Sequence, residues 1–104
     1  MVELVKKNID LITEVCRNMQ VKSLYLFGSG TNEANFDDNS DLDFVFSFIK
    51  DDQGFPAAGY DYFDLLFTLE DILKKKVDLV AEEKIRNRFF QESIRKERIK
   101  LYEA

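Results

Sequence analysis

The chain contains no histidine and no tryptophan, and its 104 residues include one cysteine and one proline. The absence of histidine excludes a histidine general base and a Ser-His-Asp triad. A single cysteine excludes an intrachain disulfide, and one cysteine without histidine makes a structural zinc site very improbable. Any chemistry must therefore depend on carboxylates, hydroxyls, amines or bound cations.

Long apolar runs are also missing. No segment approaches the roughly 20 apolar residues that cross a bilayer, and residues 1–7 lack the continuous apolar core of a signal peptide. We therefore expect a cytoplasmic protein without membrane contact, in agreement with the low cysteine content. The length predicts a single domain over residues 1–104, and ten Phe with four Tyr predict that it is folded.

Basic residues are absent between Lys22 and Lys50, although the whole chain has 15 Lys and Arg against 20 Asp and Glu. A net charge of −5 makes direct binding to nucleic acid a poor expectation, because such binding needs clustered cations. The segment without cations is itself acidic, and is either a solvated loop or a cation site. Its acidic residues are Glu33, Asp37, Asp38, Asp41 and Asp43.

Helical and strand patterns alternate along the chain, which predicts an α/β fold. Apolar residues at helical spacing predict helices over residues 2–19, 60–75 and 82–96. Short apolar or alternating runs predict strands over residues 23–27, 41–49, 77–80 and 99–102. Small polar residues over 28–40 predict a loop, with a short helix near residues 31–36.

The first predicted helix has one apolar stripe, formed by Val5, Ile9, Ile12, Cys16 and Met19. Cys16 lies on this stripe. We therefore expect a buried structural thiol rather than a reactive one.

Three carboxylates stand out. Asp41 and Asp43 are two residues apart on a predicted strand, so their side chains point the same way, roughly 6.6–7 Å apart along the backbone. Such a pair can bracket two divalent cations, and Mg²⁺ prefers oxygen ligands. Asp78 lies within the apolar run 77–80, where a buried charge is costly unless it is paired or metal-bound. The alternative is that all three are exposed at strand ends or edges.

Gly28 and Ser29 directly follow the strand predicted over 23–27. Backbone N–H groups at such a turn can hold phosphate oxygens, and a serine hydroxyl adds a donor. An ordinary turn is the alternative.

The order of a strand, Gly28-Ser29, a loop, Ser40-Asp41-x-Asp43, a helix and a strand with Asp78 resembles the minimal nucleotidyltransferase family of the DNA polymerase β-like superfamily. The resemblance spans nearly the whole chain and implies a small mixed β-sheet of about three to five strands flanked by helices, an α+β arrangement. The segments that carry it are 26–29, 39–45, 63–66, 76–80 and 94–103.

The resemblance also implies roles for individual residues. Gly28, Ser29 and Ser40 would bind the nucleoside triphosphate, expected to be ATP. Asp41, Asp43 and Asp78 would be catalytic and would hold two Mg²⁺ ions, or Mn²⁺, with Asp78 beside the acceptor hydroxyl. The acceptor oxygen would attack the α-phosphorus in line, and pyrophosphate would leave.

One feature departs from the family pattern. Family members usually carry an arginine soon after Gly-Ser, whereas residues 30–34 contain no cation. Arg86, Arg88 and Arg95 in the last predicted helix are candidates to supply the positive charge.

Short members of this family resemble the antitoxin half of toxin–antitoxin pairs, in which AMP is transferred from ATP to a tyrosine of a helical HEPN toxin. The alternatives are a binding-only antitoxin without catalysis, transfer to a small molecule such as an aminoglycoside, and an unrelated structural or metal-binding protein. Five phenylalanines lie on elements that cannot all face one core, which favours a protein partner; a homo-oligomer is also possible. They are Phe55, Phe63, Phe67, Phe89 and Phe90.

Overall fold

The computed structural model describes residues 1–104, which form four α-helices and four strands. The helices are α1 (Glu3–Lys7), α2 (Ile9–Asn18), α3 (Tyr62–Leu73) and α4 (Arg88–Glu97). The strands are β1 (Val21–Phe27), β2 (Leu42–Phe48), β3 (Val77–Ala81) and β4 (Ile99–Glu103). Three short 3₁₀ helices occupy Gly28–Thr31, Glu33–Asn35 and Glu82–Lys84. None of the helices is both long and apolar enough to span a membrane.

The strands form one mixed sheet in the order β3-β2-β1-β4. β1 is antiparallel to β2 and to β4, whereas β2 and β3 are parallel. The connection from β2 to β3 passes through α3, as a parallel pair requires. The predicted small mixed sheet flanked by helices is therefore confirmed, and β3 and β4 are its edges.

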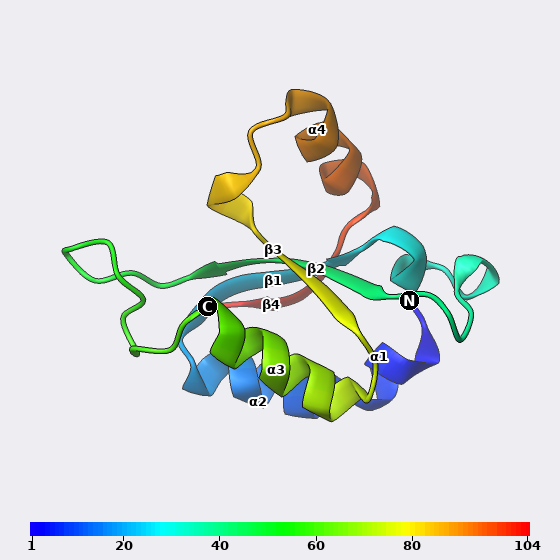
Figure 1. Ribbon diagram of the computed structural model, residues 1–104, viewed down its shortest axis with the longest axis horizontal. Coiled ribbons are helices and arrows are strands. Elements are labelled where there is room, and N and C mark those ends of the chain that lie inside the picture. The colour runs from blue at the N-terminus through cyan, green and yellow to red at the C-terminus, as the bar shows by residue number, and fades with distance from the viewer.

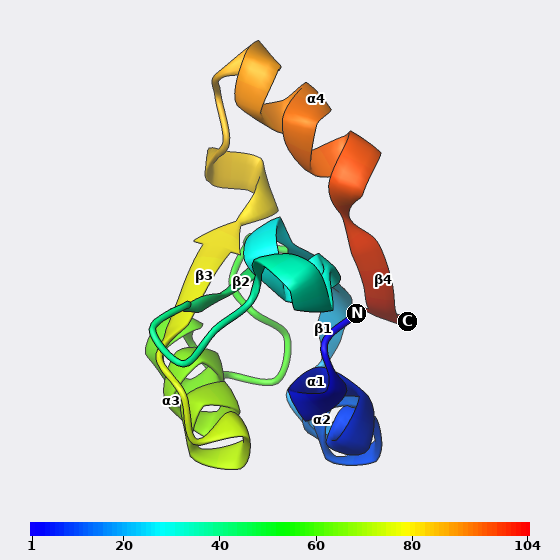
Figure 2. The same cartoon turned by 90° about the vertical axis from the view of Figure 1, so that its right-hand side faces the viewer.

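The helices cover the two faces of the sheet unequally. α1, α2 and α3 lie against one face, and α4 stands above the other (Figure 1, Figure 2). The alternation predicted for β2 is confirmed, because its apolar side chains enter the core between the sheet and α2 and α3. They are Leu42, Phe44, Phe46 and Phe48. Val45 points to the opposite face and is nevertheless buried, because it lies beneath α4 near the buried side chain of Ile94.

The helix predicted over residues 2–19 is interrupted at Asn8. The Asn8 backbone has φ −107° and ψ 8°, and its side-chain amide donates to the Leu4 carbonyl at 2.8 Å. Asparagine competes with helical backbone hydrogen bonds in this way. The apolar stripe is confirmed, since Val5, Ile12 and Cys16 are fully buried.

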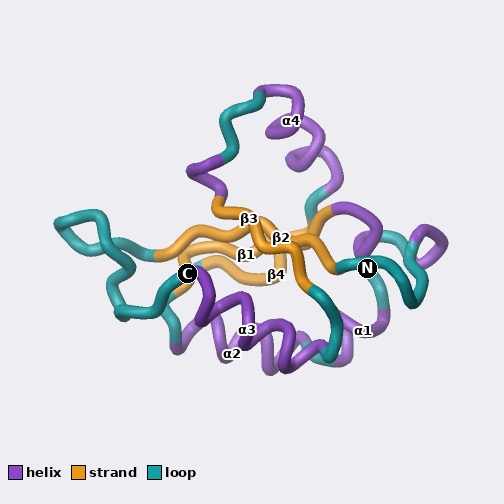
Figure 3. The backbone as a smooth tube through the Cα atoms, in the orientation of Figure 1, coloured by secondary structure: helices purple, strands orange, loops and turns teal.

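The prediction of a helix over residues 82–96 is wrong for residues 82–87. Residues 82–84 form a 3₁₀ helix that is separate from α4 (Figure 3). α4 begins after Asn87, whose side chain accepts from the Phe90 N–H at 3.1 Å. An asparagine cap starts a helix because it satisfies a free N–H group of the first turn. Phe89, which the pattern places on the apolar side, is 81% exposed.

Local hydrogen bonds also fix both ends of α3. The Asp61 side chain accepts from the Asp64 N–H at 2.9 Å, and the Asp64 side chain accepts from the Asp61 N–H at 2.8 Å. This reciprocal pair is a capping box. The helix ends at Lys74, which has φ 53° in the left-handed region.

Candidate active site

The sheet places Asp43 beside the start of the glycine turn. In the β1–β2 pair, Asp43 is the partner of Phe27, the residue before Gly28. Gly28 has φ 71°, a conformation that favours glycine, and a Cβ built on it would collide with Asp43 Oδ2. The carboxylate therefore lies directly against the turn, and only glycine permits this approach.

Two of the three predicted carboxylates, Asp43 and Asp78, come from neighbouring strands and share the α4 side of the sheet. Asp43 and Asp78 are direct partners in the parallel β2–β3 pair, so their side chains lie on the same face. Asp41 immediately precedes β2, two residues before Asp43. Asp43 is partly buried, whereas Asp41 and Asp78 are exposed.

Of the two positions that the sequence leaves open for Asp78, a buried strand and an exposed edge, the structure shows the exposed edge. Val77 and Leu79 on either side of it are buried, but β3 is an edge strand and the Asp78 side chain faces solvent. No desolvation cost therefore singles out Asp78, and its interest depends on its position beside Asp43.

The carboxylates form an uncompensated negative cluster. Burial, and then the negative charges of Asp78 and Asp41, raise the pKa of Asp43 to about 6. The protein has four ion pairs, and none involves these three residues. Oxygen donors with unpaired charge are the ligand type that Mg²⁺ and Mn²⁺ prefer, so the chemistry of these residues suits a divalent cation. Their side chains do not form a ready-made group of three metal ligands in this structure.

The predicted phosphate turn is a 3₁₀ helix over Gly28–Thr31 that lines an open groove. The turn is held by the Thr31 hydroxyl, which donates to the Gly28 carbonyl at 2.8 Å, and by the Val2 N–H, which donates to the Gly30 carbonyl at 3.0 Å. Gly30 is buried against Leu26 and Leu42 side chains. The groove is lined by Gly28, Ser29, Thr31, Asn32, Asn35, Glu97 and Ile99.

Ser40 lies in the turn before β2. Its hydroxyl donates to Asp37 Oδ1 at 3.2 Å and accepts from the Asp37 N–H at 3.1 Å. These hydrogen bonds shape the loop that leads to Asp41. Binding of nucleotide by Ser40 stays a prediction, since its hydroxyl is directed at Asp37 in this structure.

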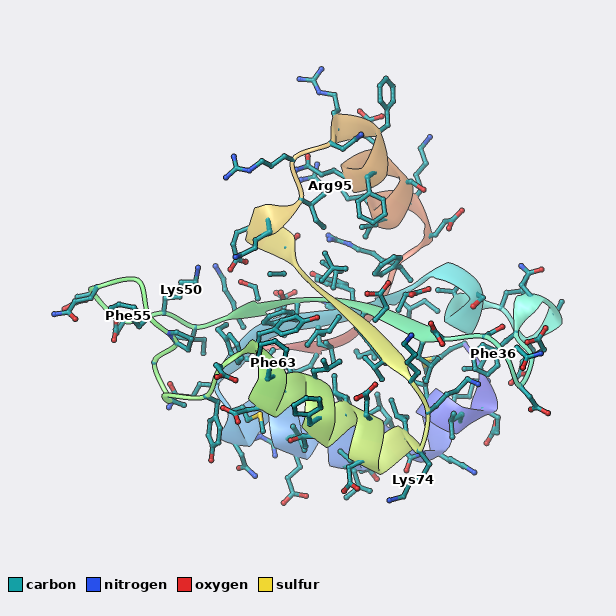
Figure 4. All side chains as sticks on the ribbon, in the orientation of Figure 1. Phe36, Lys50, Phe55, Phe63, Lys74 and Arg95 are labelled. Carbon is teal, nitrogen blue, oxygen red and sulfur yellow. The ribbon has the colours of Figure 1, made fainter.

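The groove beside the turn contains no lysine or arginine. Arg95 instead lines a small cavity beneath α4 with Val45 and Glu82 (Figure 4), and Arg86 and Arg88 lie at the other end of α4 from Glu97. None of the three arginines proposed from sequence therefore lines the groove.

Two cationic side chains outside the predicted site, Lys75 and Arg98, connect segments that surround it. Lys75 donates to the Asp38 carbonyl at 2.9 Å and lies 5.0 Å from the centre of the Phe36 ring, which fastens the acidic loop to the end of α3. Arg98 lies 4.0 Å over the Tyr25 ring and pairs with Glu82 at 3.4 Å. All four contacts join residues far apart in sequence, so no local pattern could reveal them.

The class of this protein follows from its match to a family model, and its fold agrees with that match. A family model described as "Polymerase beta, Nucleotidyltransferase" matches residues 8–104. The chain therefore belongs to the polymerase beta nucleotidyltransferase family.

One sequence relative and two solved structures are similar to this chain. The chain is 35% identical over 80 residues to the protein adenylyltransferase candidate MJ1379 of Methanocaldococcus jannaschii, a match that covers 77% of this chain and 76% of that protein. It shares its fold with a solved candidate minimal nucleotidyltransferase, with a TM-score of 0.70, 24% identity, and coverage of 93% and 92% of the two chains. It also resembles one chain of a solved complex of the tri-AMPylated Shewanella oneidensis HEPN toxin with MNT antitoxin, with a TM-score of 0.61, 19% identity, and coverage of 95% and 72% of the two chains.

Proposed function

We propose that this protein transfers AMP from ATP to a hydroxyl group of a partner protein, as the antitoxin of a pair whose toxin is a helical HEPN protein with an acceptor tyrosine. The observation that carries the proposal is the position of Asp43. Its carboxylate lies against the Gly28 turn, and burial together with the negative charges of Asp78 and Asp41 raises its pKa. The name of the MJ1379 relative supports a protein as acceptor. The AMPylated toxin in the Shewanella complex supports a HEPN partner.

Each residue of the site has a task in this proposal. Gly28 and Ser29 offer backbone and hydroxyl donors to the terminal phosphates, and Ser40 shapes the loop at the nucleotide. Asp41, Asp43 and Asp78 would hold two Mg²⁺ ions, or Mn²⁺. When bound, the cations neutralise the charge that develops on the phosphate oxygens.

Asp78 is placed to serve the acceptor. It is exposed on an edge strand, where a hydroxyl of another protein can reach it, and its negative charge helps that hydroxyl to lose its proton. The hydroxyl oxygen then forms a bond to the α-phosphorus. The bond from that phosphorus to the bridging oxygen breaks, and pyrophosphate leaves. We expect the reaction in the cytoplasm, where ATP and Mg²⁺ are available.

A binding-only antitoxin is the second candidate. It is favoured by the groove at the turn, which lacks a cation and includes the carboxylate of Glu97 where the phosphates would bind. Such a groove would weaken the attraction for a triphosphate. The toxin would then be silenced by occlusion alone.

The test is mass spectrometry of the co-expressed HEPN partner after incubation with ATP and Mg²⁺. We expect the mass of AMP on the partner, and its loss when Asp41→Asn and Asp43→Asn are combined. Asp38→Asn is the matched control, because it removes a charge from the same exposed loop without touching the proposed ligands. A partner that is silenced without any change in mass would establish the binding-only function.

A further inference from the structure

The outer side of α3 carries aromatic rings that no other part of the chain covers. Phe63 and Phe67 are four residues apart, and their rings stack with centres 5.9 Å apart and 30° between their planes. Their exposed fractions are 57% and 61%. We call this pair the α3 aromatic surface. The opposite side of α3 packs on the core through buried leucines, so α3 is apolar on two sides. An exposed apolar surface of this kind is typical of a protein contact.

Contacts to the core hold this surface in place. The Tyr62 ring meets Phe63 edge to face at 5.1 Å, and it lies 6.0 Å from the ring of Phe46, which is 3% exposed. Aromatic side chains that are already ordered lose little conformational entropy when a partner covers them. The α3 aromatic surface is therefore preorganised.

The surface continues toward the proposed acceptor side of the active site. A groove beside Phe63 is also lined by Val80, which is two residues beyond Asp78 on β3 and so roughly 7 Å from it along the strand. α3 and β3 lie on the same side of the molecule (Figure 2), and Phe63 lies beside β3 (Figure 4). A protein that presents a hydroxyl to Asp78 must approach across this edge.

Two backbone groups on the free edge of β3 are already bonded to side chains of α3. The Tyr62 hydroxyl donates to the Leu79 carbonyl at 2.6 Å, and the Glu70 carboxylate accepts from the Val77 N–H at 3.1 Å. These α3 side chains occupy backbone groups that an incoming strand would need. A partner must therefore dock on α3 through side chains, as a helix does.

The charge around the surface restricts the partner further. Residues 51–73, which include α3 and the loop before it, contain six Asp and Glu and no Lys or Arg. Lys50 and Lys84 line the groove beside Phe63, where Lys50 pairs with Glu83 at 3.2 Å, so the excess of negative charge lies on α3 itself and not in the groove. We infer that the acceptor protein docks on the α3 aromatic surface through an amphipathic helix whose apolar stripe is bordered by Lys and Arg, and that this contact brings its hydroxyl to Asp78. The inference rests on the proposed function and identifies the surface that selects the acceptor.

The test uses the full-length protein with Phe63→Ala and Phe67→Ala combined. Leu11→Ala is the control, because Leu11 is a 52% exposed apolar residue on α2, away from the site. Each variant is incubated with Mg²⁺, α-labelled ATP and a soluble extract of the source organism, and labelled protein is quantified. Calorimetry gives its affinity for Mg·ATP, and circular dichroism checks its fold. We expect the double variant to label the acceptor at least about tenfold less, with unchanged ATP affinity, whereas Leu11→Ala labels it normally.

A photo-crosslinking amino acid at position 67 identifies the docked segment. We expect the crosslinked peptide to come from the labelled protein and to be a helix with Lys and Arg beside its apolar stripe. A second copy of this chain, or an extended strand, at that position would overturn the inference. Undiminished labelling by the double variant would overturn it as well, while the proposed function would stand. If the wild type binds ATP but labels no protein, the proposed function fails, and the inference that rests on it fails with it.

Discussion

Replacing Asp43 with asparagine should make the free protein more stable at neutral pH. Burial and the charges of Asp78 and Asp41 raise the pKa of Asp43 from its ordinary value of 3.8 to about 6. Between these two pH values the folded state binds more protons than the unfolded state, so stability falls as the pH rises through the interval. The full difference corresponds to about 3 kcal/mol. Because the carboxylate is only partly buried, we expect solvent screening to reduce this to about 1–2 kcal/mol.

The measurement is urea and thermal unfolding of the wild type and Asp43→Asn between pH 3.5 and pH 8. At pH 7.5 without divalent cations, the variant should unfold about 4–8 °C higher for each kcal/mol gained, and the gap should close toward pH 4. Mg²⁺ should stabilise the wild type and have much less effect on the variant. Asp38→Asn is again the control and should change little. A variant that is no more stable than the wild type at pH 7.5, or a gap that does not depend on pH, would refute this reasoning.

Three further predictions follow from local geometry. Gly28→Ala should lower the free energy of unfolding by about 1–3 kcal/mol and weaken Mg·ATP binding, because the new side chain combines a positive φ with a collision against Asp43. Gly54→Ala is the control in unfolding experiments. Gly54 has a positive φ of 84° and open space around it, so this variant should show the backbone cost alone. Asn87→Ala should cost about 1 kcal/mol in urea unfolding by removing the α4 cap, and Asn87→Ser should restore most of it. Cys16, whose thiol pKa burial raises to about 12, should resist iodoacetamide at pH 8 until the protein is unfolded; rapid alkylation of the native protein would contradict its buried position.

The strands could be predicted because their patterns are local. The alternating Phe44, Phe46 and Phe48 on β2 can be buried together only in an extended conformation. Gly28 after a buried strand likewise indicates a turn, and the structure has one there. The site follows from these elements, since Asp43 belongs to β2, Asp41 directly precedes β2, and the turn directly follows β1.

The errors come from interactions that a periodic pattern does not contain. The side chains of Asn8 and Asn87 bond to nearby backbone groups and move helix boundaries by several residues. The exposure of Asp78 depends on the order of the strands, because the same sequence would be buried in a central strand. Lys75 and Arg98 reach partners that are distant in sequence, so only the folded chain brings them to the site.

The arrangement around Asp43 is easier to explain by function than by stability. The partly buried carboxylate of Asp43 and the two further carboxylates near it repel one another and oppose folding, and no lysine or arginine forms an ion pair with any of the three. A surface asparagine or serine at position 43 would remove the repulsion without disturbing the buried side of β2. Repulsion of this kind persists where a ligand relieves it. On the proposed function, a divalent cation with a nucleoside triphosphate is that ligand, and the missing positive charge in the groove is supplied by the ligand rather than by the chain.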